Sequence, residues 1–384
     1  MSKPLPLRAG KTLRIKDRPL EFSFWPLERN NRRYGLGARV FATDPWTVID
    51  RAIQESLTGV IRESALALKE QAEDFYMAAE SGVKAAKPLL LYYCYMNLAK
   101  CFALHSGTLT MVDNAQHGLA SSFKAPRTSD QIQDTILDAY RSPNSRGEIQ
   151  NFDVLLESIS GRKLSTAKKT LELSSILPQI VPGHRLWLQS KSIGAKERFV
   201  SIAEINFMSN PTSKKIWLQF YVFADSLKRI NKTHKDFMSE TRLNSVFQEV
   251  KCDWEMDDRD LLCFEQITPI TYTGQARDKI PELVQTVKPF LWQTVLSSRP
   301  YRKYYLYASP ASEHAGILPQ LASIYAITFF LGSIVRYRPR EFDDILAGEY
   351  GPFIQAFLND QANQFIYLMA SEFVEREVTR AAIV

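Results

Sequence analysis

The sequence predicts an α+β protein that is mainly α-helical with an inserted antiparallel β-sheet. Residues 87–107 and 318–335 are apolar on nearly every side, as central buried helices are. Between them, from about residue 198, aromatic and β-branched residues alternate with turn residues, a pattern typical of β-hairpins. Strands that follow one run of helices and precede another favour α+β over an alternating α/β fold.

The 384-residue chain is long enough for several structural regions. Four are predicted: a basic N-terminal segment with short strands (1–40), a helical region with a central helix at 88–104 (41–190), an antiparallel β region (191–275), and a C-terminal helical region that packs back on the first helices (276–384).

Apolar residues alternate with polar ones in the N-terminal segment, which predicts short strands and a hairpin between about 13 and 24. The first helix is predicted to begin at Pro45, because Asp44 is a good N-cap residue and proline fits the first helical position. It is expected to run to about residue 80, with a break near Gly59. Further helical pieces are predicted at 88–104, 129–140, 165–190, 283–298, 316–337 and 352–380.

The clearest hairpin joins strands 198–207 and 214–223 across the turn residues 209–213. Residues 252–272 are expected to add one or two strands, and residues 303–310 another.

Several classes of protein are disfavoured by missing motifs. The glycine-rich phosphate loops of P-loop and Rossmann proteins are absent, as are the signatures of serine hydrolases and zinc proteases. The four cysteines are sparse and lack zinc spacing, so the sequence predicts neither a metal site nor a cofactor. Sparse thiols and an N-terminus without an apolar signal core predict a cytoplasmic protein. Polar residues interrupt 318–335, so a buried helix is expected there rather than a membrane span.

Positive charge is concentrated at the N-terminus. The net charge is +6, and residues 1–39 hold ten Lys/Arg against three Asp/Glu, a local net charge of +7. Such a segment is suited to RNA, to DNA or to an acidic protein partner, although a solvated edge without a partner would look the same. The residues predicted to bind are Arg14, Lys16, Arg18, Arg29, Arg32, Arg33 and Arg39.

No convincing catalytic constellation is present, so whether the protein is an enzyme is left open. Arg229 and His234 have four residues between them, the spacing at which an arginine can stabilise a phosphate while a histidine transfers a proton. With five histidines in the chain, about one such spacing is expected by chance. These two residues and His117 are therefore weak catalytic candidates.

A polar motif site is the other candidate. Asn97 and Lys100 lie one turn apart on an otherwise apolar helix, and buried polar groups need partners. Arg336, Tyr337 and Arg338 end the second apolar helix, where cations complement the helix dipole and Pro339 prevents continuation. Two interpretations stay open. Either Arg336 reaches the Asn97/Lys100 face and forms an anion site, or it is a solvent-facing helix end.

Residues 87–107, the following His117–Leu119 and the stretch 318–346 resemble the YaaC-like proteins, a bacterial family of poorly defined function. The sharpest similarity lies in PLLLYY…NLAK and LGSIVRYRP. The resemblance implies an intracellular bacterial protein and assigns no catalytic residue. The helical part is also loosely similar to HEPN-type bundles, whose ribonucleases carry an Arg-x4–6-His motif.

The leading hypothesis is a non-enzymatic or cryptic subunit of a bacterial complex, in defence or nucleic-acid metabolism, which binds through the basic N-terminal segment. A HEPN-like, metal-independent ribonuclease or toxin is the alternative. A sensor of a small anionic ligand, held by Arg336 and Lys100, is the third. The oligomeric state is not predicted.

Overall fold

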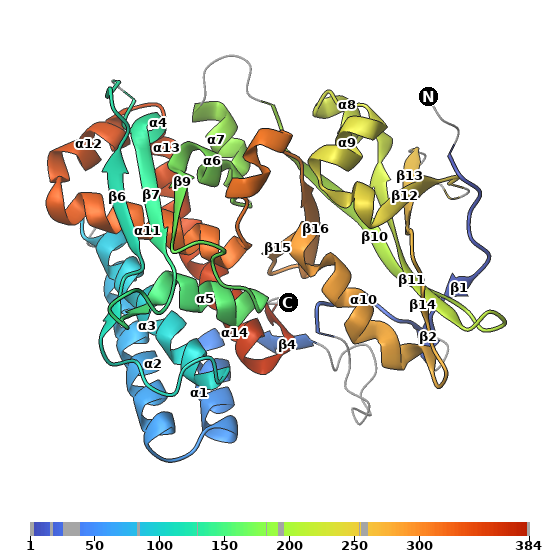
Figure 1. The fold of residues 1–384 in the computed structure, drawn as a ribbon, viewed down its shortest axis with the longest axis horizontal. Coiled ribbons are helices and arrows are strands. Elements are labelled where there is room, and N and C mark those ends of the chain that lie inside the picture. Colours follow the sequence, from blue (N-terminus) through green and yellow to red (C-terminus); the bar gives the residue numbers. More distant parts are fainter. Residues whose placement is uncertain are drawn as a thin grey trace. The chain divides into compact units, whose positions relative to one another are not determined.

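The computed structural model describes residues 4–15, 18–25, 39–82, 85–128, 130–181, 183–190, 196–252, 254 and 260–381. The chain forms two compact units, each built from separate stretches of sequence (Figure 1). Unit 1 comprises Met1–Ala42, Lys196–His314 and Glu375–Val384, and unit 2 comprises Thr43–Ala195 and Ala315–Val374. Helices dominate unit 2 and an antiparallel sheet dominates unit 1, so the predicted α+β class is confirmed.

Unit 1 contains most of the strands. They are β1 (Lys11–Thr12), β2 (Arg14–Ile15), β3 (Arg18–Pro19), β4 (Arg39–Ala42), β10 (Phe199–Asn210), β11 (Lys215–Phe223), β12 (Phe247–Val250), β13 (Leu261–Gln266), β14 (Ile270–Thr271), β15 (Leu291–Val295), β16 (Arg302–Tyr307) and β17 (Glu377–Arg380). Its α-helices are α8 (Ala224–Arg229), α9 (His234–Glu240) and α10 (Ile280–Val287), and short 3-10 turns lie at Leu243–Ser245, Ala276–Lys279 and Lys288–Phe290. A further 3-10 turn, Ala311–Gly316, begins in unit 1 and ends in the first residues of the next stretch of unit 2.

The main sheet of unit 1 has the order β12-β13-β11-β10-β16-β15, and β1 and β14 add to β10 and β11. The predicted hairpin is its centre: β10 and β11 pair antiparallel from Asn210↔Lys215 to Ile202↔Val222. A smaller parallel pair, β4 with β17, joins residues near the two ends of the chain.

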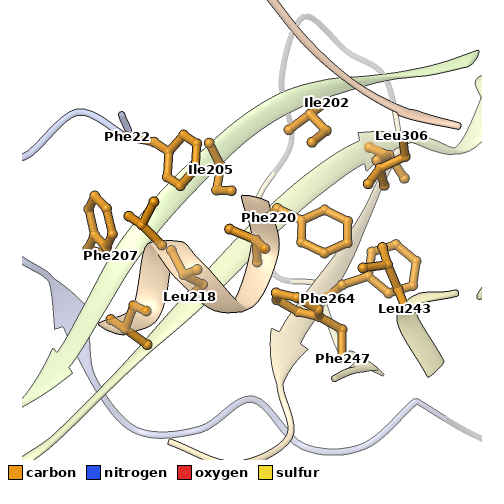
Figure 2. Packing of buried hydrophobic residues seen from close by; sticks show 14 of the residues in the cluster. Phe22, Ile202, Ile205, Phe207, Leu218, Phe220, Leu243, Phe247, Phe264 and Leu306 are labelled. Atoms are coloured by element: carbon orange, nitrogen blue, oxygen red, sulfur yellow. The ribbon is translucent and has the colours of Figure 1, made fainter. Parts of the chain in front are cut away.

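One face of this sheet carries the core of unit 1. Every second residue of β11, from Ile216 to Val222, points into it, because side chains alternate between the faces of a strand. Figure 2 shows phenylalanines of neighbouring strands gathered on this face. Phe220 stacks on Phe264 with ring centroids 5.1 Å apart, and it meets Phe247 edge to face at 5.0 Å.

Unit 2 is largely helical. Its helices are α1 (Pro45–Ser56), α2 (Gly59–Glu80), α3 (Lys87–His105), α4 (Gln131–Asp134), α5 (Asn151–Ser160), α6 (Leu173–Ile176), a 3-10 turn (Leu177–Gln179), α7 (His184–Ser190), α11 (Gln320–Tyr337), α12 (Pro339–Ala347), α13 (Gly351–Ala356), a π-helical turn (Phe357–Gln361) and α14 (Ala362–Val374). Its strands are β5 (Ala115–Gln116), β6 (Leu119–Phe123), β7 (Thr135–Tyr140), β8 (Ile149–Gln150) and β9 (Lys168–Glu172).

Helix α3 is central in unit 2 and packs against α2, α5, α11 and α14. On α2 the contact face is a row of alanines seven residues apart, Ala65, Ala72 and Ala79, all of them buried. Small side chains allow the two helices, drawn in blue and cyan in Figure 1, to approach closely. Strands β6, β7 and β9 form an antiparallel sheet, and β6 lies beside α11.

The helix start at Asp44 is confirmed, since its carboxylate accepts the N–H groups of Trp46 and Thr47. The predicted helix at 129–140 is wrong beyond Asp134, because β7 follows and pairs with β6 and β9. The helices predicted at 283–298 and 352–380 extend too far, since β15 and β17 take their last residues. Among the described residues no helix is both long and apolar enough to cross a membrane.

Candidate functional site

A pocket lies between helices α3 and α11 of unit 2, with β6 as its third side. Its volume is about 400 Å³. The lining residues are Leu89, Tyr92 and Tyr93 of α3, His117 with Leu119, Ala120 and Ser121 of β6, Phe329, Gly332, Ser333, Arg336 and Tyr337 of α11, and Arg338.

Two glycines set the shape of this pocket. At Gly332 a Cβ atom would lie 3.2 Å from the Cβ of Tyr92 and 3.3 Å from the carbonyl oxygen of Pro88, so glycine permits the close approach of α11 to α3. Gly118 has φ +77°, and a Cβ there would lie 2.8 Å from the backbone nitrogen of Phe152. Only glycine suits that turn, which leads from His117 into β6.

Arg336 lies in the last turn of α11 and reaches across to α3. Its Nη1 donates to the hydroxyl of Tyr93 at 3.2 Å, and its guanidinium lies 5.0 Å from the ring centroid of Tyr337. Within the described residues it forms no ion pair with a carboxylate. Arg336 therefore presents an uncompensated positive charge at the pocket, held in place by two aromatic residues.

Arg338 lines the pocket and also belongs to a small stack of side chains. Its guanidinium is 4.3 Å from the ring centroid of Phe123, and Arg127 lies over the same ring at 3.7 Å. Both arginines approach the carboxylate of Glu341, at 3.4 Å and 3.7 Å. The charge of Arg338 is thus partly balanced, unlike that of Arg336.

His117 supplies a titratable group in the pocket wall. Its Nδ1 lies 2.6 Å from the hydroxyl oxygen of Tyr92, whose side chain is buried. Partial burial, with the positive charges of Lys100 and Arg336, lowers the pKa of His117 below its usual value. Its Nε2 has no hydrogen-bond partner in the part of the chain that the structure describes.

The predicted polar motif site is brought together in part. Arg336, Tyr337 and Arg338 line one pocket, and the weak catalytic candidate His117 lines it as well. Asn97 lies elsewhere on α3, where its Nδ2 donates to Oε1 of Gln71 on α2 at 2.6 Å. That bond satisfies a buried amide within the helical core.

Lys100 is half-buried and lies outside the pocket wall. Burial lowers the pKa of its amine. It has no hydrogen bond or ion pair among the described residues. Lys100 nevertheless contributes to the site through its charge, which lowers the pKa of His117. On α3, Arg336 thus contacts Tyr93 and not Asn97.

The other catalytic candidates lie in unit 1, each bound to its own carboxylate. Arg229 pairs with Asp225 at 3.2 Å, and His234 Nδ1 lies 3.0 Å from both carboxylate oxygens of Glu249. No hydrogen bond joins Arg229 to His234 in the described structure. Their side chains have the sequence spacing but not a shared site.

The basic N-terminal segment is described only in part. Lys16, Arg29, Arg32 and Arg33 lie outside the described residues, as does the side chain of Arg18. Arg14 is exposed, whereas Arg39 pairs with Glu21 at 2.6 Å and Glu377 at 3.3 Å. Binding of nucleic acid or of an acidic partner by this segment stays a prediction.

Sequence reasoning missed several residues of the pocket. Phe329, Gly332 and Ser333 share one helix face with the predicted Arg336, at the i, i+3, i+4, i+7 spacing, and this signal could have identified the wall. Tyr92 and Tyr93 belong to a helix that is apolar on nearly every side, so its sequence pattern did not distinguish a pocket-lining face. Among the described residues, no group of three His, Cys, Asp or Glu side chains is placed to hold a metal ion.

Comparison with known proteins supports the resemblance seen in the sequence. The family model described as YaaC-like protein matches residues 37–373, a range that includes every residue of the pocket wall. The looser resemblance to HEPN-type bundles has no counterpart in this match. A search of curated proteins found no match to the chain. On the extent of the family match, the chain belongs to the YaaC-like protein family.

Proposed function

We propose that the protein binds a small organic anion in the pocket of unit 2 and acts as a sensor of that ligand. One observation carries the proposal: Arg336, Arg338 and His117 meet in a pocket wall whose described residues include no carboxylate. Arg338 is partly balanced by Glu341, but Arg336 has no carboxylate partner among the described residues. A concave site with such an unbalanced cation favours a ligand that brings the negative charge itself.

The charged groups suit a carboxylate or a phosphate. Arg336 offers a planar fork of N–H donors, of which only Nη1 is hydrogen-bonded in the described structure. Lys100 adds positive potential from outside the wall. The hydroxyl groups of Ser121 and Ser333, 3.4 Å apart, offer further polar contacts to a bound ligand.

The apolar part of the wall suits a flat ring. Tyr92, Tyr93 and Phe329 line the inside, and the side chain of Tyr337 at the same end of α11 is 67% exposed. An exposed aromatic ring beside an arginine is a surface on which planar groups stack. A volume of about 400 Å³ lies within the range of small-molecule sites.

Replacing Arg336 with alanine is expected to weaken ligand binding by about tenfold or more, because a hydrogen bond to a charged group contributes about 1.5–3 kcal/mol. The measurement is thermal unfolding with a panel of organic phosphates and carboxylates, followed by calorimetric titration of the best compound. A bound ligand raises the unfolding temperature of the wild-type chain.

Arg340→Ala is the matched control. Arg340 lies four residues after Arg336, is exposed and does not line the pocket. Its replacement removes the same charge, so ligand binding is expected to change little. The proposal fails when no anionic compound stabilises the wild-type chain, or when Arg340→Ala weakens binding as much as Arg336→Ala.

A further inference from the structure

His117 is held so that one ring nitrogen is bonded and the other is free. The Nδ1 atom lies 2.6 Å from the Tyr92 hydroxyl. The Nε2 atom has no partner among the described residues, and His117 lines the same wall as Arg336 and Arg338. A ligand oxygen that enters between these cations therefore meets a ring nitrogen with an unused hydrogen-bonding position.

The surroundings of His117 can accommodate a protonated ring. In an imidazolium both nitrogens donate, so Nδ1 would donate to the oxygen of Tyr92. The hydroxyl proton of Tyr92 then needs another acceptor, and the sulfur of Met96 lies 3.8 Å from that oxygen. Burial raises the pKa of Tyr92, so this hydroxyl keeps its proton at neutral pH.

Partial burial, and after it positive charge, disfavour the protonated ring and lower the pKa of His117. The charges of Lys100 on α3 and Arg336 on α11 lower the pKa of His117, and Tyr92 on α3 contacts its ring. The other ionisable groups of the same wall are Tyr93, Tyr337 and Arg338, while β6 carries no ionisable residue. On α5, the buried carboxylate of Asp153 accepts the N–H groups of Ser142 and Leu164. Asp113 lies exposed on the loop before β5.

A bound anion would favour the protonated form of His117 instead. Without a ligand, partial burial and the positive charges of Lys100 and Arg336 lower the pKa of His117, which favours the neutral ring. A doubly negative group at Nε2 would more than offset their repulsion, and the ring would take up a proton. A singly negative group would do so less completely.

We propose, resting on the anion-binding function above, that the pocket selects a phosphate monoester in its doubly ionised form and that its binding adds one proton to His117. No covalent bond forms or breaks, and the proton comes from the solvent. The site then holds three donors toward one phosphate: two guanidinium groups and one imidazolium.

The test uses phenyl phosphate and phenyl sulfate, which share a flat ring. Phenyl phosphate is mostly doubly charged at pH 7, since a phosphate monoester has a second pKa of about 6, whereas the sulfate ester carries one charge. Calorimetric titration at pH 7 in two buffers of different ionisation enthalpy gives the number of protons taken up. We expect phenyl phosphate to bind about tenfold more tightly, with uptake of close to one proton.

Two variants test whether His117 is the group that takes up the proton. His117→Gln is expected to abolish the uptake and to weaken phenyl phosphate binding about tenfold, whereas His234→Gln, in unit 1, leaves both unchanged. For phenyl sulfate, binding to the wild-type chain should weaken as pH rises through the pKa that His117 has in the complex, because only the protein titrates there.

The outcomes separate the two proposals. Binding of phenyl phosphate without buffer dependence, uptake that persists in His117→Gln, or equal affinity for the two probes overturns the assignment to His117 and leaves the anion pocket standing. If neither probe binds and no other organic anion stabilises the chain, both proposals fail.

Discussion

Replacing Glu377 with alanine is expected to lower the free energy of unfolding of unit 1 by about 3–5 kcal/mol, because it leaves buried cations without their counter-charge. The side chains of Glu377 and Arg302 are both fully buried, with Arg302 Nε 3.8 Å from Glu377 Oε2. Arg39 Nε lies 3.3 Å from the same oxygen, and the hydroxyl of Tyr304 donates to the other. The pKa of Tyr304 is raised well above its usual value by burial and the charge of Glu377, so it remains a donor.

Glu21→Ala is the control, since Glu21 pairs with the same Arg39 but its side chain is 59% exposed. Exposed ion pairs contribute about 0–1 kcal/mol, so a small loss is expected. Four of the six tryptophans, Trp25, Trp217, Trp254 and Trp292, lie in unit 1, and their fluorescence follows its unfolding in denaturant. Equal effects of the two substitutions would show that the buried network is not what stabilises the β4–β17 pair.

The parts of the fold that were predictable are those with strong local patterns. The cap at Asp44, the two apolar helices and the β10–β11 hairpin all follow from residues close together in sequence. The β4–β17 pair could not be found this way, because Arg39 and Glu377 are far apart along the chain. Residues 135–140 were assigned to a helix, but they form β7, which pairs with β6 and β9. The sequence of a short segment does not show which distant strands it will pair with, so this strand could not be predicted locally.

Some residues of the candidate site were predictable from the sequence, but the fact that they lie together in one pocket was not. The arginines at the end of α11 and the histidine before β6 were recognisable as unusual polar positions. Their meeting depends on the crossing of α3 and α11, and on the turn at Gly118 that returns the chain to that crossing. Asn97 was grouped with Lys100 by helical spacing, yet its hydrogen-bond partner is Gln71 on α2. Spacing along one helix does not show which neighbouring helix each side chain will meet.

Replacing Gly332 with valine is expected to destabilise unit 2 by about 2–3 kcal/mol, the upper part of the range for overpacked cores. The backbone of α3 is part of what an added side chain would meet, including the carbonyl oxygen of Pro88 and the Cα atom of Leu89 at 3.4 Å. Backbone atoms of a buried helix cannot turn aside as a flexible side chain can, so the two helices must separate.

Gly332→Ala is the graded control. Alanine favours a helix over glycine by about 1 kcal/mol, which offsets part of the cost of one methyl group at 3.2–3.4 Å from its neighbours. Thermal unfolding should therefore rank the alanine variant near the wild type and the valine variant well below it. Hydrogen exchange should place the loss of protection in α3 and α11.

Separation of these helices also moves Tyr93 away from Arg336, so the valine variant should bind the anionic ligand more weakly even where it remains folded. A stable valine variant with unchanged affinity would mean that the α3–α11 contact does not set the geometry of the pocket.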